Sequence, residues 1–553
     1  MRFLRPFVRT VGGVTEGVRD TFRLQQVATV LVKHGFGALL TNLDIPGLGR
    51  IPSRFEGTPE RATHALQELG PTFIKLGQVL STRPDIVPPA YLEALQTLQD
   101  DVEAVPFPAI EKLLGQELGA AWRSRVRDFD DTPLATASIA QVHPAILADG
   151  KQVVFKVQRP GISKLIRSDL NILHLLASRA MVEFPETERL DPLGVLREFE
   201  RSILGELDFS LEALAIERFR RNFADRPEVV RIPELVDELC TPRVLCIEYL
   251  DGIKIREARA RGVDMERVGQ RYLDVAYTML FEHGTFHGDL HPGNVLVLEN
   301  EVLGLLDFGM VGALTRDMRD SLVSLLFALD RGDHRTIARI FYDIAVKEER
   351  VDYAAFEADV IAVVERNWMS VDSVADMQIG RFLMEVTQGA VKHGVRAPHG
   401  YTMFFKALLT TEGLAKSLIP EVDPLAAAQP YVKRLIAERY SQDRIKEDLF
   451  YNGATFNTLA QRLPVTVSQL LDDLDKQRLQ LNVKQVYDKD SDNAADRRQN
   501  RMIIALFAVT AVVCGTLALE VQLWGFSWLT FIFYSSSTPL FLLALTMALR
   551  NRG

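Results

Sequence analysis

The sequence predicts an α+β fold in which a short β-rich stretch lies within a mostly helical chain. Hydrophobic residues recur with helical spacing over most of the 553 residues, whereas residues 135–157 contain small side chains followed by a strand-like run. With 47% hydrophobic and 25% charged residues, the composition is that of a packed protein, which excludes a mainly disordered chain. The length suggests about three or four structural units.

Proline and glycine separate the helices predicted near the N-terminus. Residues 61–69 have a helical pattern, and Gly70-Pro71 ends that helix and begins the next, because proline suits the first position of a helix. Two further prolines mark a break before a helix over 110–118.

Strand signals gather around one turn. Asp149-Gly150 precedes the β-rich run 152–157, which predicts a hairpin, and residues 243–250 are typical of a buried strand. The other predicted elements are helices over 166–183, over 192–222 and from 265 onward, interrupted by a loop at 283–293 and a strand near 302–306.

Charge and cysteine content exclude several classes. The net charge of −9 argues against a nucleic-acid binder that depends on overall basicity. The three cysteines form no C-x-x-C pair, so neither a disulfide framework nor a cysteine zinc site is supported, and a reducing compartment is the simpler interpretation.

Two uncharged runs near the C-terminus, 502–519 and 528–549, are separated by a segment whose only charge is Glu520. About 20 such residues span a bilayer, so the runs predict a transmembrane hairpin rather than two buried core helices. Arginines flank both ends, and the positive-inside rule therefore places both flanks in the cytosol.

The first forty residues carry more basic than acidic side chains and no long apolar segment, which disfavours a secretory signal. Three interpretations stay open: an amphipathic helix on anionic lipid, a mitochondrial transit peptide, or a solvated helix docked on the body of the protein.

The segment His287-Gly288-Asp289-Leu290-His291-Pro292-Gly293-Asn294 is followed by Asp307-Phe308-Gly309. Phosphoryl transfer needs a carboxylate beside the attacking hydroxyl or water, and oxygen ligands that hold Mg²⁺ against the phosphates of ATP. Asp289 supplies the first, and Asn294 and Asp307 supply the second. Lys156, in the predicted hairpin, takes the place of the lysine that grips the α and β phosphates, so the pattern predicts a protein-kinase-like fold.

A metal site is the rival interpretation of the same segment. His283, His287 and His291 recur every four residues, which on a helix would align three imidazoles. Glycine and proline interrupt that helix, so His287 and His291 are expected to orient the loop instead.

Four segments together resemble the UbiB family of atypical kinase-like proteins, also called aarF-domain or ADCK-type and associated with ubiquinone biosynthesis. The resemblance covers roughly residues 60 to 450, and the C-terminal hairpin is similar to that of bacterial members. The four segments are Lys75-Leu76-Gly77-Gln78, the alanine-rich 135–143, Glu206-Leu207-Asp208, and the histidine-rich loop from His287.

The resemblance implies a bilobed kinase-like fold whose helical N-terminal extension, bearing Lys75 and Gln78, packs over the active site and disfavours protein phosphorylation. It also implies that Glu206 and Asp208 face this extension. A third implication is that an alanine-rich loop replaces the glycine-rich loop over the phosphates of ATP; its residues are Ala135, Thr136, Ala137 and Ser138. Thr136 stands where the family usually has alanine, so the resemblance does not fix the fine nucleotide preference.

Two ion pairs are predicted between the extension, the hairpin and the helix over 192–222. Six positions turn a helix by about 600°, so Glu206 and Glu212 cannot share a face if both lie on it. We therefore expect Glu212 to pair with Lys156 and Glu206 with Lys75.

The strand over 243–250 stands where the hinge between two kinase lobes belongs. The backbone groups of Glu248 to Leu250 are therefore candidates for binding adenine, with a plain core strand as the alternative.

These features predict a membrane-anchored Mg²⁺-dependent ATPase or small-molecule kinase that supports ubiquinone biosynthesis, with membrane lipid, prenylated quinone precursors and biosynthetic proteins as partners and no nucleic acid. The expected location is the cytoplasmic membrane of a bacterium, before a mitochondrial inner membrane. A metabolite kinase and a non-catalytic, ATP-gated lipid-binding module are the alternatives.

The predicted domains are an amphipathic segment (1–60), the helical extension (61–120), an N-lobe (121–250), a C-lobe (251–440), a helical tail and linker (441–500) and the transmembrane hairpin (501–553).

Overall fold

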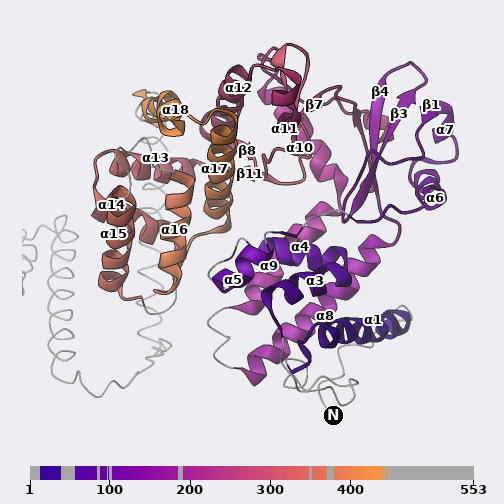
Figure 1. Ribbon diagram of the computed structural model, residues 1–553, viewed down its shortest axis with the longest axis horizontal. Coiled ribbons are helices and arrows are strands. Elements are labelled where there is room, and N and C mark those ends of the chain that lie inside the picture. Colours follow the sequence, from indigo (N-terminus) through magenta and orange to yellow (C-terminus); the bar gives the residue numbers. More distant parts are fainter. Residues whose placement is uncertain are drawn as a thin grey trace, which may run out of the picture. The chain divides into compact units, whose positions relative to one another are not determined.

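The computed structural model describes residues 13–38, 57–81, 83, 87–95, 97–98, 102–184, 191–347, 351–369, 379–439, 441–442 and 446, all within one compact unit that ends at Asp448 (Figure 1). Both predicted membrane spans lie outside the described residues. Within the described part of the chain, no helix combines the length and apolar character needed to cross a bilayer.

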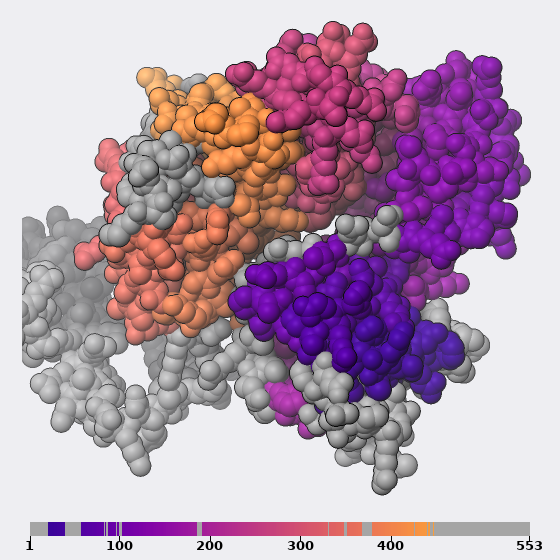
Figure 2. All heavy atoms as spheres, viewed as in Figure 1, coloured from indigo at the N-terminus to yellow at the C-terminus, as the bar shows by residue number. Residues whose placement is uncertain are grey.

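The N-terminal helices are α1 (Gly13–Lys33), α3 (Pro59–Leu69), α4 (Pro71–Leu80) and α5 (Pro89–Leu95). The predicted break at Gly70-Pro71 is confirmed, because Gly70 has a φ of 95°, a conformation that glycine adopts without strain, and Pro71 begins α4. Helix α1 docks on the body: Val27 is buried, and Arg23 Nε lies 2.7 Å from Asp169 Oδ1 of α8 (Figure 2, indigo).

The first sheet has the order β1-β3-β4-β6, with β2 paired to β3, and the pairs are antiparallel. The predicted hairpin is confirmed as β3 and β4, which meet at Gly150 with a φ of 92°. Aromatic packing of Trp122, Phe129 and Phe155 closes the core on one face of the sheet. The bounds are β1 (Val126–Phe129), β2 (Ala135–Thr136), β3 (Ala140–Leu147), β4 (Gln152–Gln158), β6 (Val244–Glu248), α6 (Phe107–Leu118) and α7 (Trp122–Arg125).

The prediction of a single helix over 192–222 is wrong. The structure has α9 (Pro192–Glu206) and α10 (Phe209–Asn222), preceded by α8 (Ile162–Glu183). Asp208 separates α9 from α10, because its side chain accepts a hydrogen bond of 3.0 Å from the Ser210 N–H and so caps α10.

The second half of the unit is mainly helical, with short strands around the histidine-rich loop. A four-stranded sheet has the order β5-β10-β9-β7, and β8 pairs with β11. The predicted strand near 302–306 is confirmed as β10. The prediction of a loop over 283–293 is wrong for its first residues. The π-helical turn η4 ends at His283, and strand β8 covers Thr285–His287. The strands are β5 (Val230–Arg231), β7 (Ile253–Lys254), β8 (Thr285–His287), β9 (Val295–Val297), β10 (Leu303–Leu305), β11 (Val311–Ala313), β12 (Val346–Lys347) and β13 (Val395–Arg396).

A large hydrophobic core joins these helices to the strands beneath the loop, and Phe286, Phe308 and Phe404 are almost fully buried in it. The helices are α11 (Ile255–Ala258), α12 (Met265–Tyr277), the turn η4 (Thr278–His283), α13 (Arg316–Asp330), α14 (His334–Ile344), α15 (Tyr353–Met369), α16 (Ile379–Val391), α17 (His399–Leu418) and α18 (Pro424–Arg439). Short 3₁₀ turns cover Asp237–Leu239, Arg259–Arg261 and Glu299–Glu301. This core fixes the base of the loop that carries Asp289.

Candidate functional site

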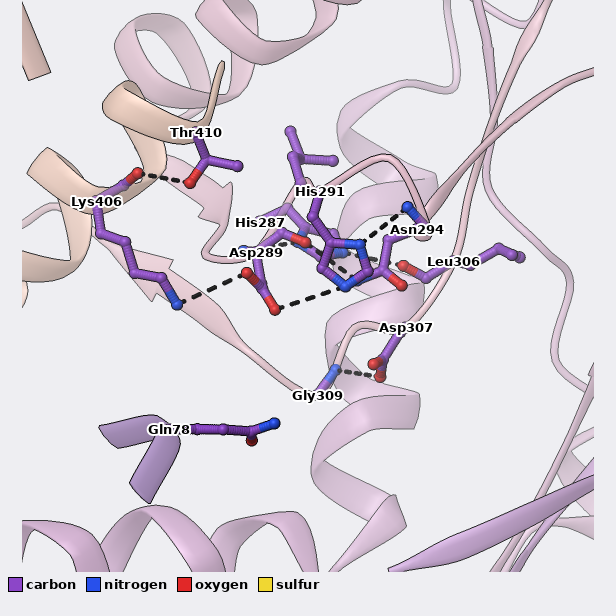
Figure 3. Close-up of polar contacts among 12 residues, drawn as sticks. Gln78, His287, Asp289, His291, Asn294, Leu306, Asp307, Gly309, Lys406 and Thr410 are labelled. Carbon is purple, nitrogen blue, oxygen red and sulfur yellow. Dashed lines mark hydrogen bonds and ion pairs between the residues drawn. The ribbon is translucent and has the colours of Figure 1, made fainter. Parts of the chain in front are cut away.

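His287, at the end of β8, is 1% exposed and holds the loop through both ring nitrogens. Nδ1 accepts a hydrogen bond of 3.1 Å from the Asp289 N–H, so Nε2 carries the proton and donates to the Leu306 carbonyl at 3.0 Å (Figure 3). Burial lowers the pKa of His287, which agrees with a neutral ring. Its nitrogens are therefore committed to the backbone, as expected for a residue that orients the loop.

The three histidines of the rival metal interpretation do not share one helix. His283 lies on the π-helical turn and His287 on β8, whereas the His291 Nδ1 accepts from the Gly293 N–H at 2.9 Å. Across the described ranges, no three His, Cys, Asp or Glu side chains group as a metal site.

Asn294 is fixed at the far end of the loop. Its Nδ2 donates to the Asp289 carbonyl at 3.0 Å, and its backbone carbonyl accepts from the Leu306 N–H at 2.9 Å. Because the amide nitrogen faces Asp289, the Asn294 side-chain oxygen points elsewhere and is the atom of this residue suited to a Mg²⁺ ion.

Asp307 has a φ of 54°, which is rare for a residue other than glycine and is typical of functional sites held by their surroundings. Its Oδ1 accepts from the Gly309 N–H at 3.4 Å and lies 3.0 Å from the Lys156 Nζ. The Lys156 ammonium holds the pKa of Asp307 well below its usual range, and Lys75 contributes further in the same direction. Asp307 is therefore an ionised carboxylate, the form that binds a metal.

Lys156 of β4 joins two elements that are far apart in the chain. Its Nζ lies 2.8 Å from Glu212 Oε1 of α10 as well as 3.0 Å from Asp307. Burial opposes the charged ammonium, but the Asp307 and Glu212 carboxylates outweigh it and raise the pKa of Lys156, so the side chain stays cationic. The predicted Lys156–Glu212 pair is present.

The second predicted pair is also present: Lys75 Nζ of α4 lies 3.2 Å from Glu206 Oε2. Since Lys75 helps to lower the pKa of Asp307, the extension lies within electrostatic reach of the site. The Gln78 side chain extends from α4 toward the Asp307–Gly309 turn (Figure 3), and its Nε2 donates to the Leu98 carbonyl at 3.5 Å. Asp208, in contrast, uses its carboxylate to cap α10.

The alanine-rich loop is held by an arginine that sequence reasoning missed. Arg159, 9% exposed, donates from Nε to the Ala137 carbonyl at 2.8 Å and from a terminal nitrogen to the Glu103 carbonyl at 2.8 Å. Ser138, in the same loop, is buried, whereas Ala135 and Thr136 form β2. In the sequence, Arg159 follows a strand with no sign of these contacts, because its partners are backbone carbonyls.

Fewer backbone N–H groups of the predicted hinge are available to adenine than the sequence suggested. The Glu248 N–H donates to the Glu234 carbonyl at 2.8 Å, and the Tyr249 N–H donates to the Gln152 carbonyl at 3.0 Å. Leu250 is the residue of this segment whose N–H makes no backbone hydrogen bond with another described residue. Of the three candidate N–H groups, that of Leu250 is therefore the one without a backbone partner among the described residues, and adenine binding by it stays a prediction.

Asp289 has a neighbour that the sequence did not reveal. Lys406 Nζ of α17 lies 3.6 Å from Asp289 Oδ1, and His291 Nε2 lies 3.9 Å from Asp289 Oδ2 (Figure 3). Sequence reasoning missed Lys406 because only the fold brings α17 against the loop.

A strand-borne lysine paired with a helix glutamate, a D-x-x-x-x-N loop and a left-handed D-F-G aspartate define a kinase-like protein. Residues 97–341 match the ABC1 atypical kinase-like domain, and residues 369–423 match the UbiB helical domain. The chain belongs to the UbiB family of atypical kinase-like proteins.

Two curated proteins and one solved structure illustrate what this chain is similar to. A probable protein kinase UbiB from Pseudomonas putida (strain W619) is 33% identical, over 80% of this chain and 85% of its own length. An uncharacterized protein in the hydrogenase 1 5′ region of Clostridium pasteurianum is 31% identical, over 91% of this chain and 93% of its own. The solved structure of the Rv3197–erythromycin complex from Mycobacterium tuberculosis is 25% identical, covers 64% of this chain and 93% of that chain, and has a TM-score of 0.39.

Proposed function

We propose that this protein binds Mg-ATP and either hydrolyses it or transfers its phosphoryl group to a small lipid-like acceptor, in support of ubiquinone biosynthesis at a bacterial cytoplasmic membrane. The observation that carries this proposal is the position of Lys156, whose Nζ lies within 3.0 Å of both Glu212 and Asp307. Kinase-like catalysis needs that lysine in place together with the metal-binding aspartate.

The residue types fit the cofactor. Asn294 offers an amide oxygen and Asp307 an ionised carboxylate, both of which are ligands that Mg²⁺ prefers. When bound, Mg²⁺ neutralises charge on the phosphates. Lys156 holds the phosphates, Asp289 orients the attacking hydroxyl or water, and Leu250 donates to adenine.

The proposed acceptor is small rather than a protein. The N-terminal extension supports this choice, because Lys75 pairs with Glu206 and lies within electrostatic reach of Asp307, which holds the extension beside the site. The association of the family with ubiquinone biosynthesis supports a prenylated, phenol-headed precursor. The uncharged runs 502–519 and 528–549 support a membrane anchor with the kinase-like part on the cytosolic side.

The test is Mg²⁺-dependent ATP turnover by the full-length protein, with and without anionic liposomes and a phenol-headed quinone precursor mimic. We expect Asp307→Asn to lower turnover at least about a hundredfold, since it removes a charged metal ligand. Asp128→Asn, which changes an exposed carboxylate on β1, is the matched control and should retain wild-type turnover.

Activity that increases with lipid and is lost in Asp307→Asn supports a membrane-coupled phosphotransferase or ATPase. Tight nucleotide binding by the wild type without turnover, together with full rescue of a quinone-deficient strain by Asp307→Asn, contradicts the proposal. That second result favours an ATP-gated lipid-binding module.

A further inference from the structure

One face of α17 lies against the catalytic loop. His399, Met403 and Lys406 are spaced by four and three residues, so they share one side of the helix. His399 Nδ1 lies 2.7 Å from Glu198 Oε1 of α9, and Lys406 Nζ lies 3.6 Å from Asp289 Oδ1. Met403, between them, reaches Gly288: a Cβ added at Gly288 would lie 3.4 Å from the Met403 Sδ.

This packing explains why the loop has glycine before Asp289. A Cβ at position 288 would also lie 3.2 Å from the Met310 carbonyl oxygen, which is closer than most such contacts, so a side chain there requires a small shift of its neighbours. Protein kinases with the H-R-D motif have arginine here. In this chain, the Met310 carbonyl oxygen and the Met403 side chain of α17 lie where a side chain at position 288 would begin.

The loop itself supplies no lysine or arginine between His287 and Asn294. In the described part of the chain, the basic side chains that contact the Asp289 carboxylate are His291, facing Oδ2, and Lys406, facing Oδ1 (Figure 3). At 3.6 Å the Lys406 contact is an ion pair rather than a hydrogen bond. It is only about one-third exposed on either side, so water screens it incompletely.

We propose that Lys406 positions the Asp289 carboxylate for phosphoryl transfer, so that the helical domain completes the catalytic centre of the kinase-like domain. The inference rests on the proposed function. Asp289 acts only if one carboxylate oxygen is aimed at the acceptor, and a fixed cation at Oδ1 limits rotation of the carboxylate. Lys406 lies in residues 369–423, outside the segment that matches the kinase-like domain.

The experiment compares Lys406→Met, Lys406→Arg and Lys406→Gln in the full-length protein by steady-state ATP turnover and by equilibrium binding of a non-hydrolysable ATP analogue. We expect Lys406→Met to lower kcat by about tenfold or more with KM for ATP and analogue affinity unchanged, because the contact is to Asp289 and not to nucleotide. Lys406→Arg, which keeps the charge, should retain kcat within about threefold. Lys433→Met, which removes an exposed lysine from α18, is the control and should match the wild type.

A double-mutant cycle distinguishes positioning of Asp289 by Lys406 from a general loss of protein stability. In an Asp289→Asn background, Lys406→Met should have little further effect on kcat, since the group it positions is already gone. If Lys406→Met lowers the melting temperature markedly, Lys406→Gln at matched stability takes its place in the cycle.

Three results would overturn the inference without touching the proposed function. The first is a wild-type kcat in both Lys406→Met and Lys406→Gln. The others are a loss of kcat in Lys406→Arg as large as that in Lys406→Met, or effects of Lys406→Met and Asp289→Asn on kcat that are fully additive. A wild-type protein without Mg-ATP turnover overturns the proposed function, and the inference falls with it.

Discussion

Lys75 of α4 and Glu206, the last residue of α9, form an ion pair of 3.2 Å in which both side chains are less than one-fifth exposed. The pair ties the N-terminal extension to the segment that leads into α10, the helix that presents Glu212 to Lys156. The extension and Lys156 are thus connected through two successive helices.

Reversing this pair gives a direct test. Lys75→Glu places two carboxylates side by side in a partly buried position, and we expect it to destabilise the protein by about 1–2 kcal/mol. The added charge reversal Glu206→Lys should restore most of the lost melting temperature. Rescue by Glu212→Lys in place of Glu206→Lys would contradict the pairing.

The stability of the folded protein should depend on pH through the ionisation of Glu412. This carboxyl of α17 is 1% exposed and accepts from the Gly380 N–H at 3.0 Å. Burial raises the pKa of Glu412 from 4.5 to about 7, although the Gly380 and Ile379 N–H groups and the Lys416 charge oppose the shift. The protonated form is therefore favoured in the folded chain. Its contribution, about 3 kcal/mol, is fully present below pH 4.5 and is lost as pH rises through about 7.

Glu412→Gln removes this titration while keeping an oxygen acceptor for the Gly380 N–H. We expect the melting temperature of the wild type to fall more steeply than that of the variant between pH 5 and pH 8. Glu421→Gln, at an exposed position, is the control and should follow the wild type. Parallel curves for the wild type and Glu412→Gln would rule out a raised pKa at this residue.

Restoring the H-R-D sequence should damage the protein. Gly288→Arg introduces a side chain whose Cβ would lie 3.2 Å from the Met310 carbonyl oxygen. We therefore expect the free energy of unfolding to fall by about 1–3 kcal/mol. We also expect ATP turnover to be lower than that of the wild type. Met403→Ala opens space on the α17 side and should recover part of the stability in the double variant. An arginine variant with wild-type melting temperature and turnover would mean that α17 does not exclude the side chain.

Local signals explain which parts of the fold were predictable. The Gly70-Pro71 break and the turn at Gly150 were predictable because each depends on backbone restrictions of the residue itself. The break between α9 and α10 contains neither glycine nor proline, and the capping residue Asp208 resembles any other surface acid. Three-residue strands such as β8 are too short for a periodic pattern.

The residues of the candidate site also fall into those that a local sequence pattern marks and those that only the fold brings together. Asp289, Asn294, Asp307 and Lys156 stand in ordered motifs, so their residue types and spacing identified them before the fold was known. Both predicted ion pairs are present, although the single helix from which they were inferred is two helices. Arg159 and Lys406 have partners that are distant in the chain, so no local pattern marked them.

Helix α17 touches α9 through His399 and the catalytic loop through Lys406, and these two residues lie about 10 Å apart along a single helix. The backbone hydrogen bonds of the helix keep these two positions from moving independently. A tilt that separates His399 from Glu198 also changes the distance between Lys406 and Asp289. The geometry of the α9 contact and that of the Asp289 loop therefore depend on the placement of one and the same helix.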